Sequence, residues 1–132
     1  MDNRLLAQEW QKIAEMDLLS AEHLLTMHPI PIEVICYHCQ QSAEKNLKAY
    51  LVLHNQNPPK THDLDELCKL CQKFSDTFKT IADICSDLTT YSVQPRYPMK
   101  FILEEQDMRK AMKNAKEIRD FILRLAPEMM AK

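Results

Sequence analysis

The sequence contains no glycine among its 132 residues. Glycine supplies positive φ angles at tight turns, and it lets the backbone approach phosphate groups closely. Glycine-rich phosphate loops and dinucleotide-binding fingerprints are therefore excluded. Seven prolines are present instead, and proline ends a helix because it cannot continue the hydrogen-bonded ladder. We expect helices separated by proline-containing segments.

Long apolar runs are also missing from the chain. No stretch approaches the roughly 20 apolar residues that span a bilayer, and no charged segment followed by an apolar one opens the sequence as a signal peptide would. The formal net charge of −2 and the pI near 6.2 argue against a uniformly basic nucleic-acid binder, but they leave room for a local basic patch. We expect a cytoplasmic protein that does not associate with membranes.

Apolar residues recur at steps of three and four in several segments, which predicts α-helices. The expected helices cover about 4–27, 33–55, 61–74, 77–91 and a last segment from 104 onward, with Thr61 as the N-cap of the third. The inner side of the first is expected to carry Leu6, Trp10, Ile13, Ala14, Ala21, Leu24 and Leu25. Short connections favour antiparallel neighbours. The sequence therefore predicts one all-α domain over residues 1–132, an up-and-down bundle of four to five antiparallel helices.

Two CxxC pairs, Cys36 with Cys39 and Cys68 with Cys71, raise the question of a zinc site. Such pairs bind zinc well when they lie in turns that wrap the metal. Here both pairs fall inside periodic helical segments, and no glycine is available to shape a knuckle. We expect the cysteines to be reduced thiols packed in the core, and we expect no metal and no cofactor. Clamping of a metal between two helices is the alternative.

The predicted second helix has two different sides. On a helical wheel, Cys36, Ala43, Leu47, Tyr50 and Leu51 gather on one side, and His38, Gln41, Lys45 and Lys48 fall within an arc of roughly 60° on the opposite side. A solvated helix surface commonly carries such polar residues. The alternative interpretation is a binding surface.

Asp17 falls within the apolar arc of the first helix. An unpaired buried carboxylate is costly, so Asp17 is expected to have a cationic or hydrogen-bonding partner, and the candidates are Lys45, His38 and Arg96. In the alternative interpretation, Asp17 lies at the edge of the arc and reaches water.

Several segments together resemble the HEPN domain, the higher eukaryotes and prokaryotes nucleotide-binding domain. They are AEMDLLSAEHLL at 14–25, CYHCQQSAEKNLKAYL at 36–51, KTHDLDEL at 60–67, and Tyr91 followed by RYP at 96–98. The resemblance implies a helical bundle that is usually a homodimer. It also implies a possible minimal nucleotidyltransferase partner protein, in a two-component system of the toxin-antitoxin or defence type.

The resemblance also indicates site residues. His38, Gln41 and Lys45 match the motif of the second helix, His62 matches the THxL histidine, and Arg96 and Tyr97 match the RYP segment. With Lys48, these form a candidate site for a nucleotide or an RNA phosphate. A guanidinium group such as that of Arg96 presents a planar fork of donors to phosphate oxygens, and Tyr97 or Tyr91 offers a ring for stacking on a base.

The ribonuclease branch of the family carries an arginine followed four to six residues later by a histidine. No arginine of this sequence has a histidine at that interval, which argues against nuclease activity. Metal-independent RNA cleavage by His38 or His62 with Arg96 is kept as an alternative function. A purely structural oligomerisation module is another.

Overall fold

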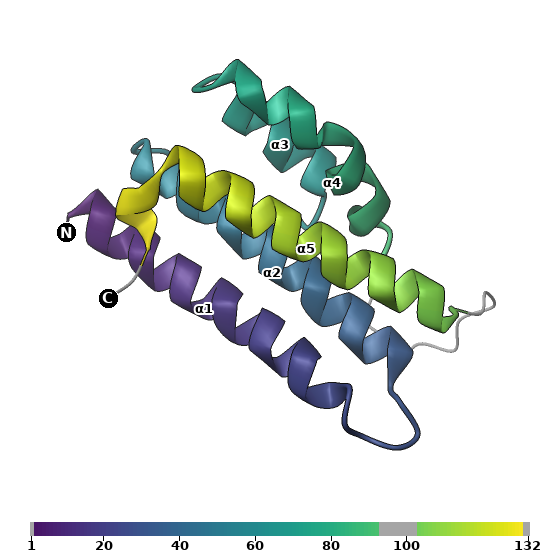
Figure 1. Ribbon diagram of the computed structural model, residues 1–132. Helices are drawn as coiled ribbons and strands as arrows, with labels where there is room; N and C mark the ends of the chain where they lie inside the picture. The colour runs from purple at the N-terminus through teal and green to yellow at the C-terminus, as the bar shows by residue number, and fades with distance from the viewer. Residues whose placement is uncertain (1, 93–102, 131–132) are drawn as a thin grey trace.

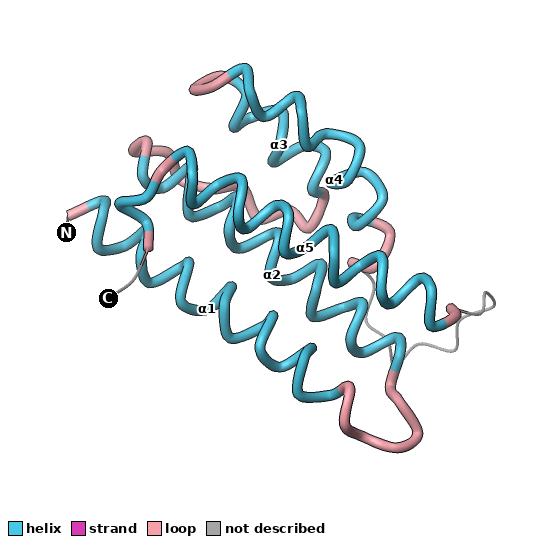
Figure 2. Tube along the Cα trace, in the orientation of Figure 1, coloured by secondary structure: helices cyan, strands magenta, loops and turns pink. Residues whose placement is uncertain are grey.

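The computed structural model describes residues 2–92 and 103–130, which form five α-helices and two short 3-10 helices (Figure 1). The α-helices are α1 (Asn3–Leu24), α2 (Ile32–Leu53), α3 (Leu64–Gln72), α4 (Ala82–Thr89) and α5 (Glu105–Leu125). The 3-10 helices span Asp76–Ile81 and Pro127–Met129. Loops join the helices, and no strand occurs in these residues (Figure 2). The predicted all-α bundle is confirmed.

The helix ends differ from the predicted ones in ways that local chemistry explains. Asp63, and not Thr61, caps α3, because its Oδ1 accepts a hydrogen bond of 2.9 Å from the backbone N–H of Asp65. Thr61 lies two residues earlier and accepts from the backbone N–H of Asp63. The predicted helix over 77–91 is divided, since a 3-10 helix precedes α4. Carboxylates do cap α5, where Glu104 and Asp107 form a reciprocal capping box.

The chain ends α2 without glycine by using an asparagine. Asn55 has a φ of 63°, the left-handed region that asparagine tolerates better than most residues. The backbone N–H of Asn55 donates to the carbonyl of Val52, and the N–H of Gln56 donates to the carbonyl of Leu51, both at 2.9 Å. These two bonds form a Schellman motif, which turns the chain out of α2 into the segment 54–63.

The loop 54–63 returns along α2, so α3 runs in the same direction as α2. The side chain of Gln40 on α2 contacts the backbone of His62, just before α3. Two turns further along α2, the carbonyl of Leu47 contacts the thiol of Cys71 near the end of α3. From Gln40 to Leu53 the helix rises about 20 Å, a span that ten loop residues can bridge. The return brings the start of α3 beside the middle of α2.

Helix α1 runs antiparallel to both α2 and α5. Asn3 contacts Asn55 near one end of the bundle, and Asp17 contacts His38 nearer the other. Gln8 likewise reaches the backbone of Glu128, beyond the end of α5. The three long helices therefore form one layer, and α3 and α4 lie against α2 and α5 as a shorter pair (Figure 1).

Helix α2 is the central element and is covered on almost every side. Fifteen of its residues are buried, including all five predicted for its core side. In α5, Met108, Ala111, Met112, Ala115, Ile118 and Ile122 are buried, whereas Leu125 at the end of this apolar stripe is 38% exposed. In α1 the prediction for Ile13 is wrong, because this side chain is 52% exposed. Leu18 is fully buried instead. The buried face of α1 is a row of small and medium residues: Ala7, Gln11, Ala14, Leu18 and Ala21.

Candidate functional site

Asp17 on α1 joins two side chains of α2. Its Oδ1 lies 3.1 Å from Nδ1 of His38, and its Oδ2 lies 2.6 Å from Nζ of Lys45. Positions 38 and 45 are two helical turns apart and so face the same neighbour. The three side chains are only 14% to 28% exposed. Two of the three partners proposed for this carboxylate are therefore in contact with it.

Glu44 forms a second carboxylate centre of the same composition. Its Oε2 lies 3.0 Å from Nζ of Lys48, and its Oε1 lies 2.9 Å from Nδ1 of His62. Glu44 is 4% exposed, and Lys48 is 7% exposed. Sequence reasoning assigned no role to Glu44. The spacing of four residues between Glu44 and Lys48, typical of an ion pair on one helix face, was the signal for it.

Two glutamines connect this second centre to the start of α3. Gln40 is fully buried and donates from its Nε2 to the backbone carbonyl of His62 at 2.8 Å. Gln41 donates from its Nε2 to Oε1 of Gln40 at 2.8 Å. Gln40, which sequence reasoning also missed, therefore holds the backbone that carries His62.

The polar residues of α2 do not form the exposed surface that the helical wheel suggested. Gln41 and Lys48 are buried, and His38 and Lys45 are partly buried. The physical reason is the central position of α2: α1 covers one flank of the polar side through Asp17, and the segment that carries His62 covers the other. We call the set Asp17, His38, Gln40, Gln41, Glu44, Lys45, Lys48 and His62 the polar cluster.

Each carboxylate of the polar cluster orients one imidazole ring. A carboxylate accepts a hydrogen bond, so Nδ1 of His38 and of His62 carries the proton in these contacts. Such a partner fixes the tautomer and the orientation of the ring. The Nε2 atom is left for another partner, and the side chain of His62 is 67% exposed. This arrangement suits proton transfer or the binding of an anionic oxygen.

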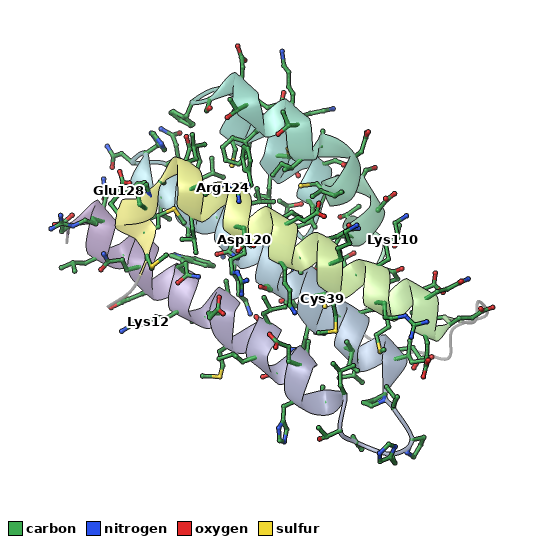
Figure 3. The ribbon with its side chains drawn as sticks, in the orientation of Figure 1. Lys12, Cys39, Lys110, Asp120, Arg124 and Glu128 are labelled. Atoms are coloured by element: carbon green, nitrogen blue, oxygen red, sulfur yellow. The ribbon has the colours of Figure 1, made fainter. Side chains whose placement is uncertain are left out.

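All five cysteines are buried free thiols, and Figure 3 shows Cys39 inside the bundle while Lys12 and Lys110 project from its surface. Burial raises the pKa of Cys36 and of Cys39 to about 12. The pKa of Cys68 is lowered to about 7, chiefly by a hydrogen bond with Cys85. Across residues 2–92 and 103–130, no group of three histidine, cysteine or acidic side chains is arranged to hold a metal ion.

Two of the predicted site residues, Arg96 and Tyr97, lie outside the described residues. Tyr91, the other candidate for base stacking, is partly buried and packs against the core. Burial raises the pKa of its hydroxyl group. Of the predicted set, the structure therefore brings together His38, Gln41, Lys45, Lys48 and His62 around two carboxylates.

Comparison with known proteins places this architecture in a family. A family model described as the HEPN domain matches residues 7–125, nearly the whole chain. The chain belongs to the HEPN domain family. HEPN domains comprise nucleotide-binding and ribonuclease-like modules, and this member lacks the arginine-histidine interval of the ribonuclease branch.

The fold of this chain is similar to that of a solved protein structure. It is the crystal structure of TT1696 from Thermus thermophilus, with a TM-score of 0.79 and 21% sequence identity. The alignment covers 94% of this chain and 98% of that one. A search of curated proteins gives no match. Within the described residues, no helix is long and apolar enough to cross a membrane.

Proposed function

We propose that this HEPN domain is a binding module for a phosphate-bearing ligand, a nucleotide or an RNA strand. In this proposal it acts in the cytoplasm as a homodimer beside a minimal nucleotidyltransferase partner, in a two-component system of the toxin-antitoxin or defence type. The observation that carries the proposal is the pair of carboxylate-held imidazoles, His38 on Asp17 and His62 on Glu44. The family assignment supports it.

The charges of the polar cluster explain how it would attract an anion. Asp17 and Glu44 balance Lys45 and Lys48, so the cluster has no formal net charge while both histidines are neutral. Each protonated imidazole adds one positive charge. The ligand would therefore be held by directed donors, the Nε2 edge of the histidines and the remaining protons of Lys45, more than by a broad positive field.

Lys45 and Lys48 have different roles in this proposal. Lys45 is 22% exposed at its side chain and keeps two ammonium protons beyond the one given to Asp17. Lys48 is 9% exposed at its side chain and is directed to Glu44. We therefore assign ligand contact to Lys45, and we assign to Lys48 and Gln41 the task of holding Glu44 and Gln40. Arg96 and Tyr97 remain predicted ligand residues.

The test is the binding of ATP and of a short single-stranded RNA, measured by calorimetry on protein whose oligomeric state is known from light scattering. We expect Lys45→Gln, His62→Gln and Arg96→Ala each to weaken binding about tenfold, as loss of one charged contact does. Lys110→Gln, which removes an exposed lysine on α5, is the matched control. No binding by a folded dimer, or equal losses in the control, would contradict the proposal.

A ribonuclease is the second candidate function, because two carboxylate-oriented histidines are also the arrangement that acid and base catalysis needs. His38 and His62 would exchange protons with the ribose hydroxyl and the leaving oxygen, and Arg96 would stabilise the phosphorane. The test is cleavage of RNA in the presence of a chelator. We expect a 2′,3′-cyclic phosphate product that His38→Gln and His62→Gln both abolish. Intact RNA after prolonged incubation would exclude this candidate.

One variant distinguishes the binding proposal from the alternative that the domain is purely a structural oligomerisation module. If the polar cluster serves only assembly, Lys45→Ala should lower the dimer population in light scattering and leave ligand binding unaltered. The binding proposal expects the reverse pattern.

A further inference from the structure

A second feature of the surface lies beyond the polar cluster, at the end of α2. A pocket with about 350 Å³ of space, counted to its open mouth, is bounded by Leu51, Leu70, Phe74 and the loop residues Gln56, Asn57 and Pro59, with Lys73 at its edge. We call it the Phe74 pocket.

The ring of Phe74 is one wall of the pocket and is 39% exposed. His54 stacks on it, with ring centroids 4.6 Å apart and planes inclined by 21°. His54 in turn lies against Tyr50, which packs on the buried ring of Phe78. This series of rings runs from the core to the surface and holds Phe74 in place. An exposed aromatic ring fixed in this way is a preformed stacking platform.

Polar side chains that can donate and accept hydrogen bonds lie around the ring of Phe74. Gln56 and Asn57 each offer an amide with both donors and acceptors, and the Nε2 of Gln56 makes only a long contact of 3.4 Å with the carbonyl of His54. Among residues 2–92 and 103–130, no side-chain hydrogen bond or ion pair engages Asn57 or Lys73. Amides read the edges of nucleobases, and a lysine adds charge for a phosphate.

We propose that the Phe74 pocket binds one nucleobase, which stacks on Phe74 and is contacted at its edge by Gln56 and Asn57, with Lys73 near the adjoining phosphate. The base belongs either to a free nucleotide or to a single-stranded RNA. Leu51 lies two helical turns beyond Glu44, about 10 Å along α2, so one short strand reaches both the polar cluster and this pocket. For the RNA case the inference rests on the proposed function.

The test follows the amide resonances of 15N-labelled protein during titration with adenosine, AMP, ribose 5-phosphate and a hexanucleotide RNA. We expect adenosine and AMP to shift the side-chain signals of Gln56 and Asn57 saturably, while ribose 5-phosphate leaves them unchanged. Phe74→Leu should weaken AMP binding at least about tenfold, since stacking carries the contact. Lys73→Gln should weaken AMP but not adenosine, and Lys69→Gln on the exposed side of α3 is its matched control.

The outcomes separate this inference from the proposed function. Equal AMP affinity in Phe74→Leu and the parent protein, shifts that map elsewhere, or equal binding of ribose 5-phosphate would overturn the nucleobase site. RNA binding that needs Lys45 and His62 but not Phe74 would overturn it as well, and would leave the proposed function standing. A third outcome is that adenosine binding needs Phe74 while RNA affinity is unchanged in Lys45→Gln and His62→Gln. This result would support the nucleobase site and contradict the role given to the polar cluster. Stronger binding of the hexanucleotide than of AMP, lost in Phe74→Leu, would identify RNA as the source of the base.

Discussion

Lys45 on α2 lies with its Nζ 2.6 Å from Oδ2 of Asp17 on α1, and the same carboxylate contacts His38 through its other oxygen. One acidic side chain thus ties the two longest helices together and sets the orientation of an imidazole. Five residues of α1 and fifteen residues of α2 are buried. Replacement of Asp17 should therefore affect folding and the site together.

Asp17→Asn keeps the shape of the side chain but leaves Lys45 and His38 without their anionic partner. We expect the free energy of unfolding to fall by about 1–3 kcal/mol, near the lower end because the three groups retain some exposure. Urea denaturation at pH 7 measures the change. The control is Asp87→Asn, which breaks an exposed pair with Lys110 and should cost less than about 0.5 kcal/mol. Equal losses in the two variants would contradict the expectation.

The Glu44–Lys48 pair is more deeply buried, with side chains 5% and 9% exposed. Lys48→Met leaves Glu44 as a buried charge that is held only by its hydrogen bonds from His62 and Gln41, and we expect a loss of about 3 kcal/mol. Glu44→Leu combined with Lys48→Met removes both charges. The double variant should be more stable than the sum of the single effects predicts, by about 2 kcal/mol. Additive losses in a double-mutant cycle would show that the pair is not coupled.

Buried thiols should make the fold sensitive to alkali. Burial raises the pKa of Cys36 and of Cys39 from the usual 9.0 to about 12, and it raises that of Cys71 as well. Below pH 9 these thiols are protonated in both states. Above pH 9 the unfolded chain releases protons that the folded chain keeps, so stability falls as pH rises toward 12, by up to about 1.4 kcal/mol per pH unit for each thiol.

Urea midpoints between pH 8 and 10 measure this slope. The variant Cys36→Ala with Cys39→Ala should show a shallower decline, because two of the responsible groups are gone. A midpoint that stays constant up to pH 10 in the parent protein would refute the assignment.

Two polar side chains of α2 are buried without hydrogen-bond partners among the described residues: Ser42 through its Oγ, and Asn46 through both amide atoms. Buried polar atoms of this kind reduce stability. We expect Ser42→Ala and Asn46→Leu each to raise the free energy of unfolding by about 1 kcal/mol in chemical denaturation. A loss of stability in Asn46→Leu would mean that the amide is hydrogen-bonded in solution.

Ile13 and Leu18 on α1 offer a direct comparison of exposed and buried apolar residues. Ile13 is 52% exposed and Leu18 is fully buried. We expect Ile13→Ser to change the free energy of unfolding by less than about 0.5 kcal/mol and Leu18→Ala to lower it by about 3 kcal/mol. Thermal and urea unfolding of the two variants decide this. A large loss in Ile13→Ser would indicate that this side chain is covered in solution, as in a dimer.

Local patterns were enough to predict the helices and the main core stripes. Periodicity depends on neighbours three and four residues apart, so it predicted α1, α2 and α5 and the buried side of α2 that carries Leu47 and Leu51. It was less reliable at helix ends, where Thr61 and Asp63 are both suitable capping residues and only Asp63 accepts from the first turn of α3. For Asp17, the cost of an unpaired carboxylate indicated a partner before any contact was known.

The sequence by itself determined that this chain is a glycine-free helical bundle with reduced, buried thiols and a polar row on its second helix. Only the tertiary structure decided that α2 lies in the centre, that Glu44 forms a second carboxylate centre with Lys48 and His62, and that Ile13 faces outward. A helical wheel orders the side chains around one axis, but the number and position of the neighbouring helices decide which of those sides are covered. That information is carried by contacts between residues far apart in the chain.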